Sequence, residues 1–280
     1  MSGFSPEWLA LREEADHRAR ATQLAEKLAA DLSALAKVRI MDLGCGTGSN
    51  LRALAPALGK EQDWVLVDED SELLTRANTV LRDWADYAEG HKSNLSLYYG
   101  EQIIHVRFVT HDLSEGLGPL LKTPCDLVTA SALCDLVSPD WITGLARDLA
   151  AHKIPFFTVL TYDGRMQWFP PHERDESVRE AFNAHQISDK GFGPASGPHA
   201  TELLQNAFHQ YAYHVETADS PWIINRADEE ALLQALGEGI AEAAQALKPE
   251  VNLKDWIDAL ANRRSVMIGH LDFYATPQKT

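Results

Sequence analysis

The sequence predicts an α/β fold in which helices cover both faces of a mainly parallel sheet. Short apolar runs alternate with segments of helical period, and a glycine-rich turn joins the first run to the helix that follows it. Residues 38–41 are the first expected strand, residues 42–48 the turn, and Ser49 to about Leu58 the helix. Residues 64–67 and a helix from Ser71 repeat the pattern, so right-handed crossovers between parallel strands are expected.

The remaining elements follow from the same two periodicities. Ser5-Pro6-Glu7 is typical of a helix start, and a long helical region is expected from there to about Ala36. A hairpin-like extension around Gly100 is expected to lead into the third strand. Residues 163–198 show no clear period, which is typical of an insertion that caps a site. The other expected elements are strands at 126–130, 155–160, 211–216 and 265–274, and helices at 141–150, 201–209 and 228–247.

Composition limits the classes of function. The 280 residues suffice for one domain, and a content of 45% hydrophobic and 24% charged residues is ordinary for a globular protein. A formal charge of -16 repels a polyanion, so no nucleic acid partner is expected. Cys45, Cys125 and Cys134 include no close pair, which argues against a disulfide framework or a zinc site, and no metal is expected. Because the chain shows neither a signal peptide nor a membrane span, we expect a cytoplasmic protein without membrane contact, monomeric or homodimeric.

The glycine turn is where the sequence places a ligand. Glycine lets the backbone approach a ligand closely, and Gly44, Gly46 and Gly48 stand between strand and helix. Asp68 ends the next strand, where a carboxylate can accept hydrogen bonds from both hydroxyls of a ribose. The spacing is G-x-G-x-G instead of the G-x-G-x-x-G of dinucleotide sites, and Asp42 would repel a pyrophosphate but attract an ammonium group. These features favour S-adenosylmethionine over NAD.

The segment Asp42-Leu-Gly-Cys-Gly-Thr-Gly48 resembles the first motif of class I S-adenosylmethionine-dependent methyltransferases, and Val67-Asp68 resembles their ribose-binding acid. Asp112 is similar to the acid that this family places near the adenine amino group. The resemblance covers roughly residues 38–161. It implies a Rossmann-like sheet of seven strands, the last antiparallel, within a single domain. That domain would comprise an N-terminal helical region (1–37), a cofactor-binding core (38–162), a substrate cap after the fifth strand (163–198) and the C-terminal part of the core (199–280).

The residues expected to hold the cofactor lie in the glycine turn and at the ends of the second, third and fourth strands. They are Asp42, Gly44, Cys45, Gly46, Gly48, Asn50, Asp68, Glu69, Asp112, Leu113 and Ser131. Ordinary structural roles stay open for some of them, since Asp42 and Asp112 also suit caps and Cys45 also suits a small packing position.

The leading hypothesis is a methyltransferase that acts on oxygen or nitrogen of a small-molecule metabolite by in-line displacement. A hydroxyl acceptor benefits from a nearby base, and His185 is the first candidate for a catalytic group, followed by Asp163 and His172. The expected substrate-binding residues are polar or aromatic and lie after the fourth strand, after the fifth strand or in the cap: Asp135, Tyr162, Arg165, Trp168, Asn183, Gln186, Lys190 and Phe192. Loop or packing roles are the alternative for His172, Trp168 and Phe192.

Other functions stay open. A methyltransferase acting on RNA would need a basic groove, which this composition does not offer, whereas an acidic surface suits a basic protein acceptor. A regulatory module that binds S-adenosylmethionine without turnover, and a nicotinamide-dependent dehydrogenase, are the further alternatives. Formation of S-adenosylhomocysteine and binding of NAD are the observations that separate them.

Overall fold

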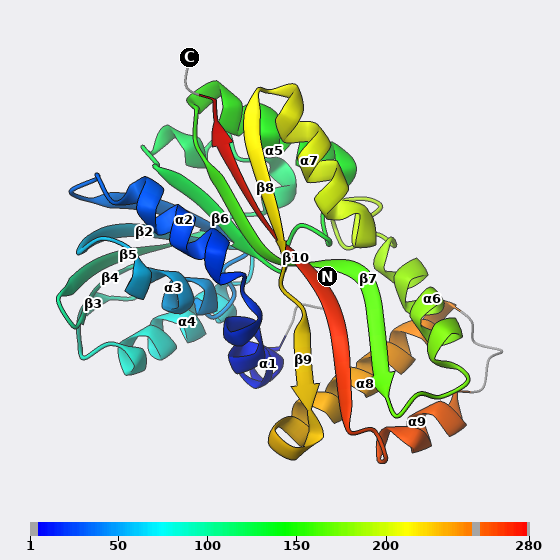
Figure 1. Ribbon diagram of the computed structural model, residues 1–280. Coiled ribbons are helices and arrows are strands. Elements are labelled where there is room, and N and C mark those ends of the chain that lie inside the picture. The colour runs from blue at the N-terminus through cyan, green and yellow to red at the C-terminus, as the bar shows by residue number, and fades with distance from the viewer. Residues whose placement is uncertain (1–4, 248–252, 279–280) are drawn as a thin grey trace.

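The computed structural model describes residues 5–247 and 253–278, which form a mixed α/β structure around one sheet (Figure 1). The strands are β1 (Val38–Leu43), β2 (Glu61–Asp68), β3 (Tyr87–His91), β4 (Asn94–Tyr99), β5 (Gln102–Thr110), β6 (Leu127–Ser131), β7 (Phe156–Phe169), β8 (Tyr213–Asp219), β9 (Trp222–Asn225) and β10 (Ser265–Pro277). The α-helices are α1 (Pro6–Ala19), α2 (Thr22–Leu32), α3 (Ser49–Leu54), α4 (Ser71–Trp84), α5 (Pro139–His152), α6 (Asp175–Gln186), α7 (Ala200–Gln210), α8 (Arg226–Leu247) and α9 (Lys254–Leu260).

The order of the strands is β3-β4-β5-β2-β1-β6-β7-β10-β8. Strands β5, β2, β1, β6 and β7 are parallel, and β10 is antiparallel to both β7 and β8. The predicted mainly parallel sheet with an antiparallel last strand is therefore confirmed. The expected count of seven strands is wrong for the described residues, which form ten. The difference arises because a hairpin of β3 and β4 extends the edge at β5, and β9 pairs with the start of β10.

Helices on the two faces of the sheet bury two apolar cores. Because successive residues of a strand point to opposite faces, Ile40 and its neighbour Met41 belong to different cores. The core that holds Ile40 includes Leu28 of α2, and the core that holds Met41 includes Leu145 of α5 and Phe208 of α7. The parallel strands end together at one edge of the sheet, between these layers, and this edge carries the residues after β1, β2 and β6 that the sequence selects.

Strands β7 and β10 extend past the ends of the neighbouring strands and, with the elements that pack on this extension, form what we call the distal lobe. It consists of the second half of β7, the first half of β10, and β9, α6, α8 and α9 (Figure 1). Residues 163–198, expected to form a substrate cap, contribute the end of β7 and α6. The lobe also includes β9, α8 and α9 from the C-terminal part of the chain. Two separate segments of the chain therefore form the part of the lobe that covers the sheet edge.

A buried arginine links the segments of the distal lobe. Arg263, 1% exposed, donates hydrogen bonds to the carbonyl of Pro170 and to the carboxylate of Asp175. Its guanidinium carbon lies 5.5 Å from the ring centroid of Trp168 and 5.9 Å from that of Trp256, which is within cation–π range. These contacts join the end of β7, the start of α6 and the turn after α9.

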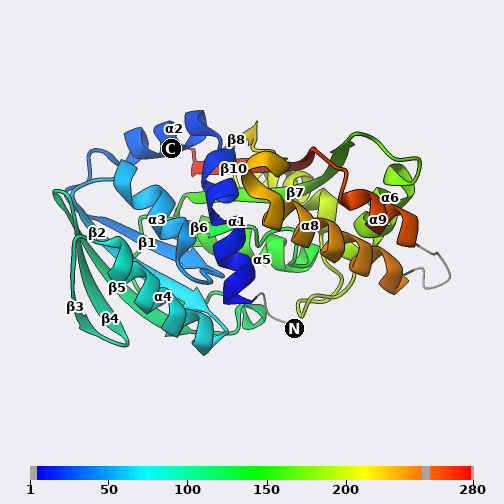
Figure 2. The ribbon, with the colours of Figure 1, turned by 90° about the horizontal axis from the view of Figure 1, so that it is seen from below.

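The expected N-terminal helical region consists of two helices, α1 and α2, with a break at Arg20 and Ala21. Arg20 has an extended backbone (φ -55, ψ 138). The Ala21 amide donates to Asp272 Oδ2 of β10 at 2.8 Å instead of bonding within a helix. The break lets α2 pack on the sheet while α1 crosses its edge (Figure 2). Within the described residues, no helix is both long and apolar enough to span a bilayer.

Candidate functional site

The glycine turn after β1 adopts backbone conformations that other residues rarely take. Gly44, Gly46 and Gly48 have φ values of +63, +51 and +78. A Cβ at Gly44 would lie 3.2 Å from a methyl group of Leu133, and one at Gly46 would lie 3.1 Å from a methyl group of Leu9. The turn therefore needs glycine both for its conformation and for the close approach of its neighbours.

Asp68, at the end of β2, is fixed by the turn that it faces. Its Oδ2 accepts the Gly46 amide at 2.8 Å and its Oδ1 accepts the Asp70 amide at 3.0 Å. Each carboxylate oxygen has a second lone pair, so two further hydrogen bonds from a ligand remain available. Burial raises the pKa of Asp68 above its usual range, although the two amide bonds oppose the shift. The result is a preorganised acceptor pair beside the glycine turn.

A chain of buried polar groups lies behind the turn. Asn50 of α3 donates to Asp42 Oδ1 at 2.7 Å and to Thr129 Oγ1 at 3.1 Å, and its own oxygen accepts Arg20 Nη1 at 2.9 Å. Asp42 Oδ2 and two nitrogens of Arg20, Nε and Nη2, are buried without a partner. Burial raises the pKa of Asp42 to about 7, against the opposing effects of Asn50 and Arg20. The network therefore contains both an unpaired carboxyl oxygen, on Asp42, and unpaired guanidinium nitrogens, on Arg20.

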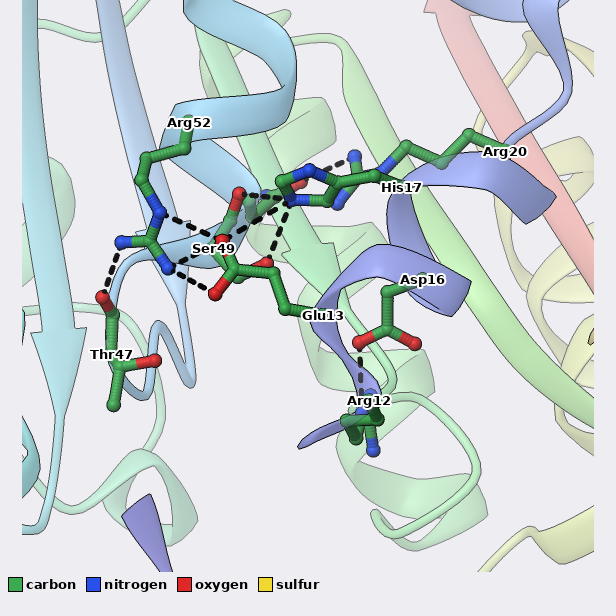
Figure 3. A network of polar contacts seen from close by, with 9 residues as sticks. Arg12, Glu13, Asp16, His17, Arg20, Thr47, Ser49 and Arg52 are labelled. Atoms are coloured by element: carbon green, nitrogen blue, oxygen red, sulfur yellow. Dashed lines mark hydrogen bonds and ion pairs between the residues drawn. The ribbon is translucent and has the colours of Figure 1, made fainter. Parts of the chain in front are cut away.

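Helix α1 is held against the turn by polar contacts (Figure 3). Arg52 of α3 donates to both carboxylate oxygens of Glu13, at 2.8 and 2.7 Å, and to the carbonyl of Thr47 at 2.8 Å. The Nε2 atom of His17 lies 2.9 Å from Ser49 Oγ. Bidentate arginine–carboxylate pairs are the stronger kind of ion pair, so α1 is firmly seated where a cofactor would meet the turn.

Two cavities meet at this edge of the sheet. The first, of about 210 Å³, is lined by predicted residues of the turn and the strand ends: Gly44, Gly46, Asp68, Glu69, Leu113 and Ser131. The second, of about 460 Å³, lies between the sheet edge, α1 and the distal lobe. Arg12, Ala132 and Leu136 line both. The two cavities therefore adjoin, as a donor site and an acceptor site must for direct group transfer.

The second cavity contains several polar groups that the sequence selects. Asp135, Tyr162, His185, Gln186 and Lys190 all line it. Burial raises the pKa of Asp135 to about 6, and burial together with Lys190 lowers the pKa of His185. The Nζ atom of Lys190 lies 3.4 Å from His185 Nδ1. The cavity thus offers two groups that can accept a proton near neutral pH.

Other predicted residues lie close to the cavities without lining them. Asp42, Cys45, Gly48 and Asn50 are buried behind or within the turn. The side chain of Asn183 accepts the Tyr162 hydroxyl at 2.7 Å and so positions a residue of the second cavity.

Among the remaining predicted residues, five line neither cavity: Asp112, Asp163, Arg165, Trp168 and His172. Asp112 is exposed and caps the short helix after β5 by accepting the Ser114 amide at 2.8 Å. Asp163 is paired with Arg165, which also reaches Asp219. His172 lies in the turn before α6, where its amide donates to Asp175 Oδ2 at 2.7 Å. Phe192, expected beside the substrate, lines the first cavity, and Trp168 packs against Trp256 in the distal lobe.

Sequence reasoning missed the contributions of α1, α8 and the last strand. Leu9 and Arg12 line the first cavity, and Trp8, Trp222 and His270 line the second. Asp16 holds this wall together, since it accepts Arg12 Nε at 2.8 Å and Trp222 Nε1 at 3.0 Å. The charged first half of α1 is the one feature of the sequence that indicates such a contribution, because it suggests a helix that covers a binding site. By sequence alone Trp222, which follows the strand expected at residues 211–216, suits either a wall of the site or a turn, whereas nothing in the sequence brings His270 to this edge.

Comparison with known proteins identifies the fold. No family model matches the sequence. The structure is similar to that of a cyclopropane-fatty-acyl-phospholipid synthase-like protein from Lactobacillus casei, with a TM-score of 0.54 and 15% identity over 98% of this chain and 94% of that one. This likeness shows a mixed α/β Rossmann-like methyltransferase fold with a mainly parallel sheet and an antiparallel edge, which confirms the fold that the glycine motif implied.

Two further similarities are more limited. Over 70 residues the sequence is 46% identical to the biotin biosynthesis bifunctional protein BioCD of Bordetella avium. That match covers 25% of this chain and spans only 15% of the length of the curated relative. A SAM-dependent methyltransferase from Geobacter sulfurreducens, solved with S-adenosyl-L-homocysteine, has a TM-score of 0.46 and 16% identity over 98% of this chain and 99% of that one.

Proposed function

We propose that the chain is an S-adenosylmethionine-dependent methyltransferase that transfers a methyl group to oxygen or nitrogen of a small molecule. The observation that carries this proposal is the junction of the two cavities at Arg12, Ala132 and Leu136, with the glycine turn and Asp68 lining the first of them. A site for a ribose and a separate site for an acceptor therefore share one wall.

The described residues fit the cofactor at both of its ends. Asp68, already oriented by two backbone amides, has free lone pairs for the two ribose hydroxyls. Asp42 and Arg20 each keep buried hydrogen-bonding atoms without a partner, and their opposite charges suit the ammonium and the carboxylate of an amino acid. A pyrophosphate would instead meet the buried carboxyl of Asp42, which disfavours a dinucleotide.

When bound, S-adenosylmethionine supplies an electrophilic methyl group. The task of the protein is then to orient the acceptor and exclude water. Helix α1, clamped by Glu13 and Arg52, covers the turn and closes one side of both cavities. Asp135 and His185 are the groups in the second cavity able to take a proton from an acceptor.

Calorimetric titration with S-adenosylmethionine and, separately, with NAD tests the proposal. Asp68→Ala should weaken S-adenosylmethionine binding at least tenfold, about 1.4 kcal/mol, because both ribose contacts are lost. Asp63→Ala is the matched control, since Asp63 lies on the same strand outside both of these cavities. Equal binding by wild type and Asp68→Ala, or binding of NAD alone, would refute the cofactor assignment.

Activity needs its own measurement. Incubation with S-adenosylmethionine and fractionated metabolites should yield S-adenosylhomocysteine and a methylated product. Binding of the cofactor without a product from any fraction would instead favour a regulatory module that does not turn over.

A further inference from the structure

The second cavity has a polar end near the cofactor side and an apolar end along α8. Asp135, Arg12 and Lys190 form the polar end. Ala235, Leu236, Gly239, Ile240 and Ala243 of α8 form one wall of the apolar end. The cavity therefore suits a molecule with a polar head and a hydrocarbon body.

Small residues on α8 leave room for that body. Ala235, Gly239 and Ala243 follow one another at intervals of four residues, so they lie on one face of the helix, over a length of about 12 Å at 1.5 Å per residue. A Cβ at Gly239 would meet no atom within 4 Å. Phe182 of α6 and Ile268 of β10 also line the cavity with apolar surface. The groove is thus open, apolar and elongated.

The polar end contains a buried acceptor atom without a donor. Asp135 is 9% exposed, and its Oδ1 is buried with no hydrogen-bond partner. Such an atom is costly unless a ligand satisfies it, so the head of the acceptor must bring an O–H or N–H group. Arg12 and Lys190 are two cations that act on the single carboxylate of Asp135, so they oppose the attraction of this carboxylate for an ammonium head. A carboxylate head has no hydrogen to donate. A neutral hydroxyl meets all three conditions.

We propose that the acceptor is an amphipathic alcohol whose hydroxyl group donates to Asp135 and whose hydrocarbon body lies along α8. The binding claim stands on the cavity, whereas methylation of this hydroxyl rests on the proposed function. In that reaction the hydroxyl oxygen forms the new bond to the methyl carbon, the carbon–sulfur bond breaks with its electron pair left on sulfur, and the hydroxyl proton passes to Asp135.

The surroundings of Asp135 are consistent with this role. Several charged or titratable groups act on Asp135 or line the same cavity: Arg12 of α1, Cys134 beside it in the chain, Tyr162 of β7, His185 of α6, Lys190 after α6, and His270 of β10. Arg12 and Lys190 favour its ionised form, and its pKa of about 6 leaves it ionised and able to accept a proton above neutral pH. Burial lowers the pKa of His270 to about 3, so this imidazole stays neutral and competes poorly as a base.

Binding of eight-carbon probes tests the proposal without turnover. The fluorescence of Trp8 and Trp222, which line the cavity, should respond to 1-octanol in protein saturated with S-adenosylhomocysteine and in protein alone. Octylamine, octanoate and 1-methoxyoctane differ from 1-octanol only at the head, and each should bind at least tenfold more weakly. Affinity should rise about fourfold for each methylene from butanol upward until the groove is filled.

A matched pair of variants tests whether the hydrocarbon body of the alcohol lies along α8. Gly239→Leu should fill the groove and weaken 1-octanol binding at least tenfold. Glu238→Leu adds the same side chain at the neighbouring exposed position and should leave binding unchanged.

The outcomes separate the two proposals. The proposal on the acceptor is overturned if protein that binds S-adenosylhomocysteine does not bind 1-octanol, if octylamine or octanoate binds more tightly, or if Gly239→Leu has no effect. If 1-octanol binds as expected but S-adenosylhomocysteine does not bind, the cavity assignment holds and the proposed methyltransferase function fails.

Discussion

Replacement of Asp42 by asparagine should change how stability depends on pH. The Asp42 carboxyl is fully buried, with one oxygen bonded to Asn50 and the other without a partner. Its pKa is raised from an ordinary value near 4 to about 7 in the folded protein. Between these values the folded state binds more protons than the unfolded state, so the stability contributed by this group falls as pH rises from about 4 to 7.

The magnitude follows from the size of the shift. About three pKa units at 1.36 kcal/mol each give roughly 4 kcal/mol over the whole window, of which about 2.5 kcal/mol falls between pH 5 and pH 8. Asparagine is uncharged throughout, so Asp42→Asn should gain about 2.5 kcal/mol of unfolding free energy relative to wild type over the same interval. Other titrating groups are common to both proteins and cancel in the difference.

Urea unfolding at pH 5, 6, 7 and 8, followed by circular dichroism, measures this difference. Asp112→Asn is the control, because hydrogen bonds from Ser114 lower the pKa of that exposed carboxyl, so it is ionised throughout this interval and its profile should run parallel to that of wild type. Parallel pH profiles for wild type and Asp42→Asn would refute the argument that burial holds this group in its neutral form.

Three further outcomes follow from the structure. An ammonium group beside Asp42 favours its ionised form, so binding of S-adenosylmethionine at pH 6.5 should release up to one proton, seen by calorimetry in buffers of different ionisation enthalpy, and Asp42→Asn should abolish that release. Arg263→Met removes one partner of a buried ion pair and should lower the free energy of unfolding by about 3–5 kcal/mol in urea titrations; a loss below 1 kcal/mol would contradict the linking role given to Arg263. Gly237→Ala places a Cβ 2.5 Å from a methyl group of Leu260 and should cost about 1–3 kcal/mol, whereas Gly239→Ala meets open space and should stabilise α8 by up to about 1 kcal/mol, so equal effects in the same titration would count against the packing described here.

The sequence predicts the cofactor side of the site well, because its determinants are local. A glycine turn after an apolar strand fixes where the chain bends, and the next strand must end beside it in a parallel sheet. Gly44, Gly46 and Asp68 therefore come together as expected. Asp112 does not line the cavity, since its side chain caps the helix that it precedes, which is the alternative that residue type alone leaves open.

The acceptor side is harder to predict because it depends on tertiary contacts. Helix α6 has few buried apolar residues, with Val178 and Ala181 the buried ones, so its period is weak in a segment of mixed charge. Trp222 reaches the cavity because β9 pairs with β10 opposite Ile268, and His270 reaches it because β10 pairs with β7 opposite Tyr162. Similarly, the break between α1 and α2 depends on the carboxylate of Asp272, which is distant in the sequence. The sequence at the break contains no proline or glycine that would predict it.

The continuity of β7 and β10 bears on how acceptor specificity can be exchanged between related proteins. These two strands run without interruption from the sheet into the distal lobe, so the lobe is not a module inserted at one point of the chain. Grafting a foreign acceptor cavity onto this cofactor site would require transplanting two stretches at once, one on each side of α7 and β8, with the strand register preserved. Exchange of a single loop would replace only one of the two chain segments that line the acceptor cavity.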